Sequence, residues 1–294
     1  MASAELNKVL EIIKSQPRNP NATVDKMRAG MERVSERVAP DVKCEPVRVG
    51  NMAAEWIVPP EAATDRAILY LHGGGYFFCS PATHRPITLG MAAGADARVL
   101  APRYRLAPEH RFPAAVEDAT AAYRGLLATG TPAERIVIGG DSAGGGLALA
   151  TLLSLREAGV ALPAGAVLFS PWTDLAATGE SLVTNDKSDV MFYGRGLGRG
   201  ARLYLGDTPA DHPLASPLYA DLRGLPPLFI QASDSEVLLD DSVRLAAKAE
   251  AAGTTVRFKA WRRLPHVWQI FSPFLPEARA ALAETAGFIR SVVP

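Results

Sequence analysis

The segment IVIGGDSAGG, residues 136–145, predicts a strand, a sharp turn and a helix in immediate succession. Its first three residues are apolar, as in a buried strand, and an apolar helical run extends from Ala143 to about Leu155. Ser142 lies at the turn in a G-x-S-x-G pattern. Gly140 and Gly144 flank it where any side chain would collide with the adjoining strand and helix. Such an elbow lifts a serine hydroxyl to the positive end of a helix, so Ser142 is the predicted nucleophile.

The rest of the chain has the alternation of strands and helices that this elbow requires. Helical stretches near residues 114–128, 143–158, 240–252 and 277–292 separate short apolar runs. Those runs cover residues 47–49, 54–58, 67–71, 98–101, 136–138, 166–169, 228–230 and 255–261. The later runs are continuously apolar, as in strands buried on both faces. The pattern predicts an α/β fold whose central sheet is mostly parallel and is flanked by helices.

Two regions do not follow this alternation. Apolar residues recur at helical spacing in the first 40 residues, as Leu6, Val9, Leu10 and Ile13 before Pro17, and as Val24, Met27, Met31, Val34 and Val38 before Pro40. Residues 173–222 are irregular and rich in Gly and Pro. We therefore expect residues 1–45 to form the N-terminal helical part of a cap. Residues 46–294 are expected to form the catalytic domain, with 173–222 as a cap insertion.

Composition excludes several classes of protein. Lys and Arg number 31 and Asp and Glu also 31, so the formal net charge is zero. Nucleic acid or an anionic membrane surface would demand a basic excess, so neither is an expected partner. No apolar run reaches the roughly 18 residues of a membrane span, and the start of the chain lacks the pattern of a secretory signal. Two cysteines are too few for a disulfide framework or a zinc cluster. A cytoplasmic protein without metal or cofactor is expected.

A glycine loop follows the apolar run that ends at Leu71. It reads His72-Gly73-Gly74-Gly75, and its backbone N–H groups are open to a close approach by substrate. Such a loop supplies an oxyanion hole together with the N–H after the nucleophile. Gly73, Gly74 and Ala143 are the predicted donors. No Gly-Lys-Ser/Thr follows, which disfavours a phosphate-binding loop.

The general base is predicted to be His266. Of the five histidines, only His266 follows both the elbow and the last strand-like run, the order expected of a hydrolase with this elbow. The acid should lie after the strand at 228–230, where residues 233–241 read SDSEVLLDD. Asp240 and Asp241 suit the first turn of the next helix. Asp234 and Glu236 both remain candidates on physical grounds.

Together these residues resemble the bacterial hormone-sensitive lipase-like esterases of the α/β-hydrolase fold. The resemblance rests on the glycine loop, the elbow, the segment Tyr104–Ala115 (YRLAPEHRFPAA), and the shorter strings SPW at 170–172 and HVW at 266–268. In that family the acid begins an Asp-Pro-Leu-x-Asp string. The matching string here is EVLLD at 236–240, which puts Glu236 in the acid position and leaves Asp234 as second choice.

The resemblance implies a serine carboxylesterase acting on short- to medium-chain acyl esters through Ser142, His266 and Glu236. Tyr76, Phe77 and Trp172 would bind substrate beneath the cap, and a homodimer is possible in this family. Two alternatives remain. One is an amidase on the same triad. The other is a non-catalytic receptor on the same scaffold, disfavoured because family-like receptors lose the histidine that His266 supplies.

Overall fold

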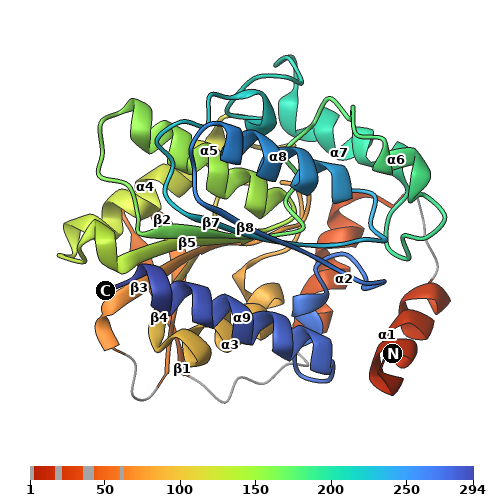
Figure 1. Cartoon of the computed structure of the whole chain (residues 1–294), viewed down its shortest axis with the longest axis horizontal. Helices are drawn as coiled ribbons and strands as arrows, with labels where there is room; N and C mark the ends of the chain where they lie inside the picture. Colours follow the sequence, from red (N-terminus) through yellow and green to blue (C-terminus); the bar gives the residue numbers. More distant parts are fainter. Residues whose placement is uncertain (1–2, 17–21, 36–42, 60–62) are drawn as a thin grey trace.

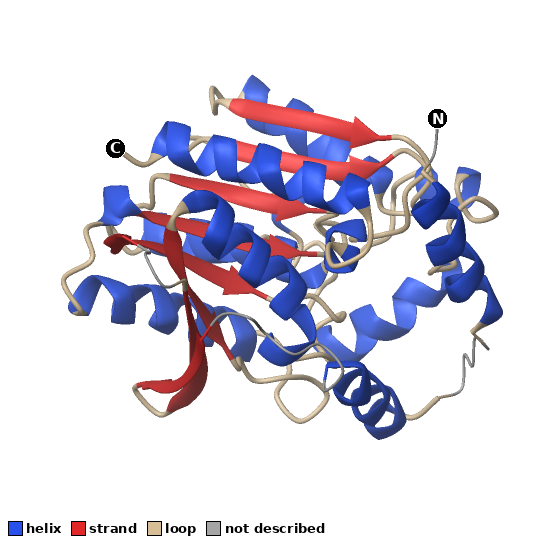
Figure 2. Ribbon diagram, turned by 90° about the horizontal axis from the view of Figure 1, so that it is seen from below, coloured by secondary structure: helices blue, strands red, loops and turns tan. Residues whose placement is uncertain are grey.

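The computed structural model describes residues 3–16, 22–35, 43–59 and 63–294. Its centre is an eight-stranded sheet in the order β1-β2-β4-β3-β5-β6-β7-β8 (Figures 1 and 2). The strands are β1 Lys43–Val49, β2 Met52–Val58, β3 Ala63–Leu71, β4 Ala97–Pro102, β5 Ile136–Asp141, β6 Gly165–Phe169, β7 Leu228–Ser233 and β8 Val256–Trp261. The pairs β1–β2 and β2–β4 are antiparallel, and every other pair is parallel. The predicted mostly parallel sheet is therefore confirmed.

Helices cover both faces of this sheet. Figure 1 shows α4, α5 and α8 over one face and α3 and α9 over the other. Their bounds are α3 Arg85–Ala95, α4 Ala114–Ala128, α5 Ala143–Glu157, α8 Leu239–Ala251 and α9 Pro276–Val292. In β3, Leu69 and Leu71 pack into the core beneath α4 and α5, while Ile68 and Tyr70 pack into the core beneath α3 and α9. The continuous apolar runs are thus buried on both faces, because successive side chains of a strand point to opposite sides.

The N-terminal helices are α1 Ala4–Ser15 and α2 Val24–Ser35, as the apolar spacing predicted. Pro17, Val38 and Pro40, which belong to that pattern, lie outside the described residues. Leu6 of α1 is buried in a cluster with residues of α9 and the preceding loop. Arg28 of α2 donates hydrogen bonds to the carbonyl oxygens of Phe77 and Ala107, at 2.9 and 2.8 Å. These contacts fix α2 beside the glycine loop.

The insertion between β6 and β7 is more regular than its composition suggested. It contains α6 Ser181–Thr184, the twelve-residue helix α7 Gly194–Leu205 and a 3₁₀ turn, Pro217–Tyr219. Arg199 of α7 donates to the carbonyl oxygen of Ala22, just ahead of α2, at 2.8 Å. The insertion and the N-terminal helices therefore touch. None of the helices in the described ranges has the length and apolar character needed to cross a membrane.

Candidate active site

Ser142 lies on a sharp turn between β5 and α5, with φ 51° and ψ −123°. A side chain is rarely held in this conformation unless its surroundings enforce it. Here the glycines two residues before and two residues after Ser142 allow the backbone of the turn to pack closely. A Cβ on Gly144 would lie 2.0 Å from the carbonyl oxygen of Leu71, and one on Gly140 would lie 2.2 Å from that of Gly144. Only glycine fits at either position, so the strand–turn–helix predicted from residues 136–145 is confirmed.

Hydrogen bonds to its neighbours fix the backbone of the turn. The Ser142 N–H donates to the carbonyl oxygen of Phe169, and the Trp172 N–H donates to the carbonyl oxygen of Ser142, both at 2.8 Å. The half-buried hydroxyl of Ser142 sits at the N-terminus of the fifteen-residue helix α5, where the helix dipole favours negative charge. The turn thus presents an oriented hydroxyl at the carboxyl edge of the sheet.

Glu236 and His266 meet although they come from different loops. Glu236 follows β7, and His266 follows β8. The Glu236 Oε2 atom lies 2.5 Å from Nδ1 of His266, and its Oε1 atom accepts the Ser233 N–H at 2.8 Å. Both side chains are buried. Because an ionised carboxylate can only accept, the imidazole proton must be on Nδ1, and Nε2 is left with its lone pair.

Asp234, the other candidate acid, lies elsewhere. Its side chain is exposed, and its Oδ1 atom accepts the backbone N–H of Arg263 at 2.7 Å. The Ser233 hydroxyl donates to the carbonyl oxygen of Leu264 at 2.6 Å and so joins the loop after β7 to the loop that carries His266. Of the two candidates left open by the sequence, the structure brings Glu236, not Asp234, to the imidazole.

The environment of His266 favours its protonated form. Burial works against the charged imidazole, but the Glu236 carboxylate, and more weakly those of Asp189 and Asp141, outweigh burial and raise the pKa of His266 above its ordinary value. Within the described part of the chain, neither Nε2 of this ring nor the Ser142 hydroxyl forms a hydrogen bond. A buried ring nitrogen with a lone pair and no partner is available to take a proton.

The glycine loop is held by a buried carboxylate that the sequence analysis did not single out. Asp141, directly before Ser142, accepts hydrogen bonds from the Tyr70 hydroxyl at 2.7 Å, from the Gly73 N–H at 3.0 Å and from Nε2 of His84 at 3.1 Å. Burial opposes its ionisation, but contact with His84 and Tyr70 outweighs burial and holds the pKa of Asp141 below its ordinary value. The feature of the sequence that could have identified Asp141 is its position in the elbow motif, directly before Ser142.

This network changes the expected oxyanion hole. The Gly73 N–H is engaged by Asp141, so it is not free as the sequence-based assignment supposed. A Cβ on Gly73 would lie 2.2 Å from Oδ2 of Asp141, which explains why the position must be glycine. The N–H groups of Gly74 and Ala143 donate to no group in the described ranges. Two of the three predicted donors are therefore available to a ligand.

The predicted substrate-binding aromatics surround the start of α5. Tyr76 stacks on Tyr204 of α7 with ring centroids 3.7 Å apart, and Trp172 lies 6.3 Å from Tyr76. Phe77 and Trp172 both approach Gly200 of α7. All three predicted residues are buried between the hydrolase sheet and the insertion. Tyr76 and Trp172 also lie close to Gly146 in the first turn of α5, and all three residues approach α7.

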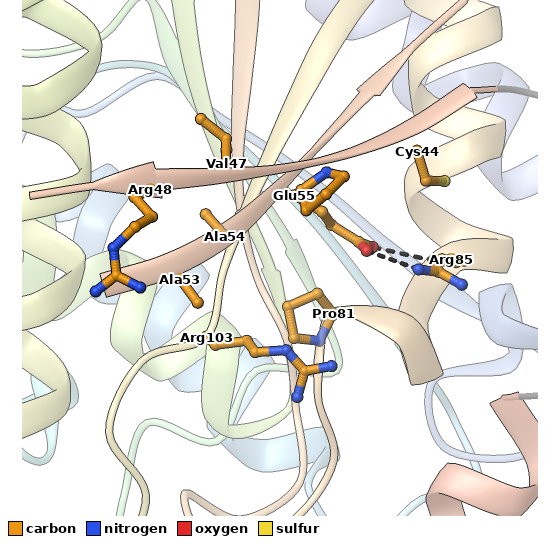
Figure 3. Close-up of a pocket in the computed structure, with 10 residues that line it drawn as sticks. Cys44, Val47, Arg48, Ala53, Ala54, Glu55, Pro81, Arg85 and Arg103 are labelled. Carbon is orange, nitrogen blue, oxygen red and sulfur yellow. Dashed lines mark hydrogen bonds and ion pairs between the residues drawn. The ribbon is translucent and has the colours of Figure 1, made fainter. Parts of the chain in front are cut away.

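A pocket of about 630 Å³ lies at the antiparallel edge of the sheet, where Cys44, Glu55, Arg85 and Arg103 are among its lining residues (Figure 3). Arg85 donates to Glu55 in an ion pair of 2.8 Å. None of the predicted catalytic residues lines this pocket. In the part of the chain described by the structure, no cluster of three or more His, Cys, Asp or Glu side chains could hold a metal ion.

The fold and the elbow define an α/β hydrolase, and residues 68–270 match the family model described as alpha/beta hydrolase fold. Comparison with known proteins is more specific. The chain is 45% identical to an acetyl-hydrolase of Streptomyces hygroscopicus over 99% of its length and 98% of that protein. It is 39% identical to an esterase of Acinetobacter venetianus, covering 86% of the chain and 84% of the relative.

Solved structures agree with these relatives. A crystal structure of an esterase from the bacterial hormone-sensitive lipase family covers all of both chains, with a TM-score of 0.95 and 45% identity. The esterase EstE5, soaked with p-nitrophenyl butyrate, matches 99% of both chains with a TM-score of 0.95 and 44% identity. The chain therefore belongs to the hormone-sensitive lipase family of α/β hydrolases, and it is a carboxylesterase.

Proposed function

We propose that the protein hydrolyses short- to medium-chain acyl esters through a triad of Ser142, His266 and Glu236. The observation that carries the proposal is the 2.5 Å contact between Glu236 and Nδ1 of a buried His266 whose Nε2 has no other partner in the described residues. This contact fixes the tautomer that a general base needs. The His266 loop also adjoins the elbow, since the Val267 N–H donates to the hydroxyl of Ser170, next to the residue that accepts the Ser142 N–H.

Each residue of the triad has a distinct role in the reaction. Nε2 of His266 takes the proton of the Ser142 hydroxyl as its oxygen attacks the ester carbonyl, and Glu236 stabilises the resulting imidazolium. The N–H groups of Gly74 and Ala143 donate to the oxyanion, and Gly73 would join them only by sharing its proton with Asp141. His266 returns the proton to the leaving alcohol. Water then cleaves the acyl-enzyme with the same base.

We further propose that α1, α2 and the insertion at 173–222 form a cap over the elbow. The bond from Arg199 to Ala22 and the packing of Tyr204 on Tyr76 support this arrangement. Tyr76, Phe77 and Trp172 would form the wall of the acyl site. Because these buried aromatic side chains pack against each other and against α7, we expect short acyl groups to fit best. The acetyl-hydrolase relative and the butyrate ester used with EstE5 support the same size class.

The test is hydrolysis of p-nitrophenyl esters from C2 to C16 by the wild type and Ser142→Ala side by side. We expect turnover that peaks at short chains and falls to background in the variant, with both proteins folded by circular dichroism. Equal rates in the two proteins, or a peak at the longest chains, would contradict the proposal. An ester compared with its isosteric amide separates esterase from amidase. Faster cleavage of the amide would overturn the ester assignment.

A further inference from the structure

The loop that carries Glu236 is bound by a segment of the insertion about 50 residues away in sequence. Nδ2 of Asn185 donates to the carbonyl oxygens of Asp234 and Glu236, at 3.2 and 2.9 Å. The hydroxyl of Ser188 donates to the carbonyl oxygen of Ser235 at 3.0 Å. Consecutive backbone groups of the acid loop are therefore satisfied by side chains of residues 185–189, which make no part of the parallel sheet.

Asp189 is the buried centre of this contact, with 5% of its surface exposed. Its Oδ2 atom accepts the N–H of Val237, the residue after the proposed acid, at 2.9 Å. Its Oδ1 atom accepts the N–H groups of Met191 and Phe192, at 2.7 and 2.9 Å. One carboxylate thus binds the acid loop with one oxygen and the following stretch of the insertion with the other.

Phe192 extends this arrangement to the imidazole. Its ring meets that of His266 edge to face, with centroids 5.0 Å apart and planes at 83°. Asp189 therefore acts on two sides of His266. On one side it fixes the loop that presents Glu236 to Nδ1, and on the other it fixes the aromatic ring that covers the imidazole.

We propose that Asp189 and Asn185 are positioning residues for the esterase reaction, holding Glu236 and Phe192 so that His266 keeps the orientation a general base needs. The inference rests on the proposed triad. Neither residue touches the reacting atoms, so both act through Glu236 and His266. A displacement of a catalytic group by a fraction of an ångström is enough to lower the rate, which makes such a support measurable.

Asp189 has a second effect through its charge. The carboxylates that face His266 are Glu236 from the β7–α8 loop, Asp189 from the insertion and Asp141 from β5, and each stabilises the imidazolium. Asp189→Asn removes one of these charges. It also replaces one of the two carboxylate oxygens by an NH₂ group, which cannot accept a hydrogen bond. At least one of the three hydrogen bonds from backbone N–H groups is therefore lost. Asn185→Ala removes the hydrogen bonds to the acid loop without changing any charge.

The experiment measures kcat, KM and the pH profile of kcat/KM with p-nitrophenyl butyrate. For Asp189→Asn we expect kcat to fall about tenfold, the effect of losing one buried hydrogen bond to a charged group. KM should stay near the wild-type value. The acid limb should move to lower pH by on the order of half a unit, because an anion near the imidazole is gone. Asn185→Ala should lower kcat without moving the acid limb.

Asp186→Asn is the matched control. Asp186 lies on the same segment, but its carboxylate accepts the Gly194 N–H at 2.8 Å and, among the described residues, forms no hydrogen bond with the loop that carries Glu236. It should keep the wild-type kcat and acid limb. If Asp189→Asn behaves like this control, the inference is overturned. Should Asp189→Asn fail to fold, Asn185→Ala decides: a fall in kcat beyond the control supports the inference, and equality with the control overturns it.

Failure of the inference is distinguishable from failure of the proposed function. If His266→Ala and Glu236→Gln lose activity while both positioning variants keep it, the triad stands and the support role is wrong. If His266→Ala keeps activity, the triad itself is wrong.

Discussion

Replacing Glu236 by glutamine is the sharpest test of the proposed acid, because both carboxylate oxygens are already committed. Oε1 accepts the Ser233 N–H, and Oε2 accepts the Nδ1 proton of His266. Glutamine offers one oxygen and one NH₂ group in their place. If its oxygen stays with Ser233, the NH₂ faces Nδ1. That nitrogen must then accept, so the ring proton moves to Nε2 and His266 no longer takes a proton from the nucleophile.

The opposite orientation of the amide is also unfavourable. Its oxygen would accept from Nδ1, but its NH₂ would then face the Ser233 N–H, leaving a buried donor without a partner at a cost of about 1–3 kcal/mol. At that cost, roughly one molecule in 6 to one in 160 would hold the active tautomer. Loss of the charge that stabilises the imidazolium lowers the rate further. A drop in kcat of about 10³- to 10⁴-fold is expected, in line with the roughly 10⁴-fold loss for an amide at this place in a serine protease triad.

The assay is hydrolysis of p-nitrophenyl acetate by Glu236→Gln at enzyme concentrations high enough to detect that residual rate, with thermal unfolding as a check on the fold. Asp234→Asn is the matched variant, since this exposed carboxylate binds only the Arg263 N–H among the described residues. It should retain nearly full activity. A rate within tenfold of the wild type for Glu236→Gln, or an equally inactive Asp234→Asn, would refute the assignment.

Three further predictions concern protonation and packing. Although burial opposes charge on His266, the Glu236 carboxylate raises the pKa of the imidazole. The wild-type kcat/KM should therefore fall on the acid side of an apparent pKa above 6.5, and a midpoint below 6.5 in a pH series would contradict this. Burial raises the pKa of Asp241 from 3.8 to about 7, so the folded chain keeps a proton that the unfolded chain loses, and this group's contribution to stability falls as the pH rises from about 4 to 7. The unfolding free energy of Asp241→Asn minus that of the wild type should therefore be a few kcal/mol larger at pH 8 than at pH 5. If denaturant titrations give the same difference at both pH values, the prediction is wrong. Gly144→Ala should abolish activity, since its Cβ would lie 2.0 Å from a carbonyl oxygen of β3. A Cβ on Gly287, which lies in α9, would have no atom within 4 Å, so Gly287→Ala should fold and react normally. If Gly144→Ala and Gly287→Ala have the same activity, the packing argument is wrong.

The parts of the fold that could be predicted from sequence are those fixed by neighbours along the chain. The elbow is one in part: a Cβ on Gly140 would meet Gly144, four residues further along the chain, whereas the need for glycine at 144 comes from the distant Leu71 of β3. The buried strands are another, because continuous apolar runs are typical of strands that are buried on both faces. The assignment of Glu236 over Asp234 needed more. Physical reasoning left both open, and only the register of a family-like motif favoured the residue that the structure brings to His266.

Two of the helices that the sequence analysis did not predict, α3 and α7, contain several glycines. In α3, Gly90 and Gly94 would place a Cβ 2.7 and 2.9 Å from side-chain atoms of α9, so these glycines permit two helices to pack closely. In α7, Gly194 faces a backbone oxygen of α6 and Gly200 faces Phe77. Glycine weakens a helix by about 1 kcal/mol relative to alanine, so sequence alone disfavours a helix there. Packing against a distant element compensates, and a local pattern does not contain that information.

The hydrogen bonds between the insertion and the loop that carries Glu236 could not be predicted from the sequence either, because they also join segments that are distant along the chain. Asn185 and Asp189 belong to a polar stretch that resembles an ordinary surface loop, and their partners lie about 50 residues further along the chain. Ser142 is held by the sheet and one helix, whereas the loop that carries Glu236 has backbone groups that are bonded by side chains of the insertion. A change in the insertion should therefore alter the base more than the nucleophile. We therefore expect the insertion to influence catalysis in addition to its proposed role as a cap, so variants of it should be measured for pH dependence as well as for substrate preference.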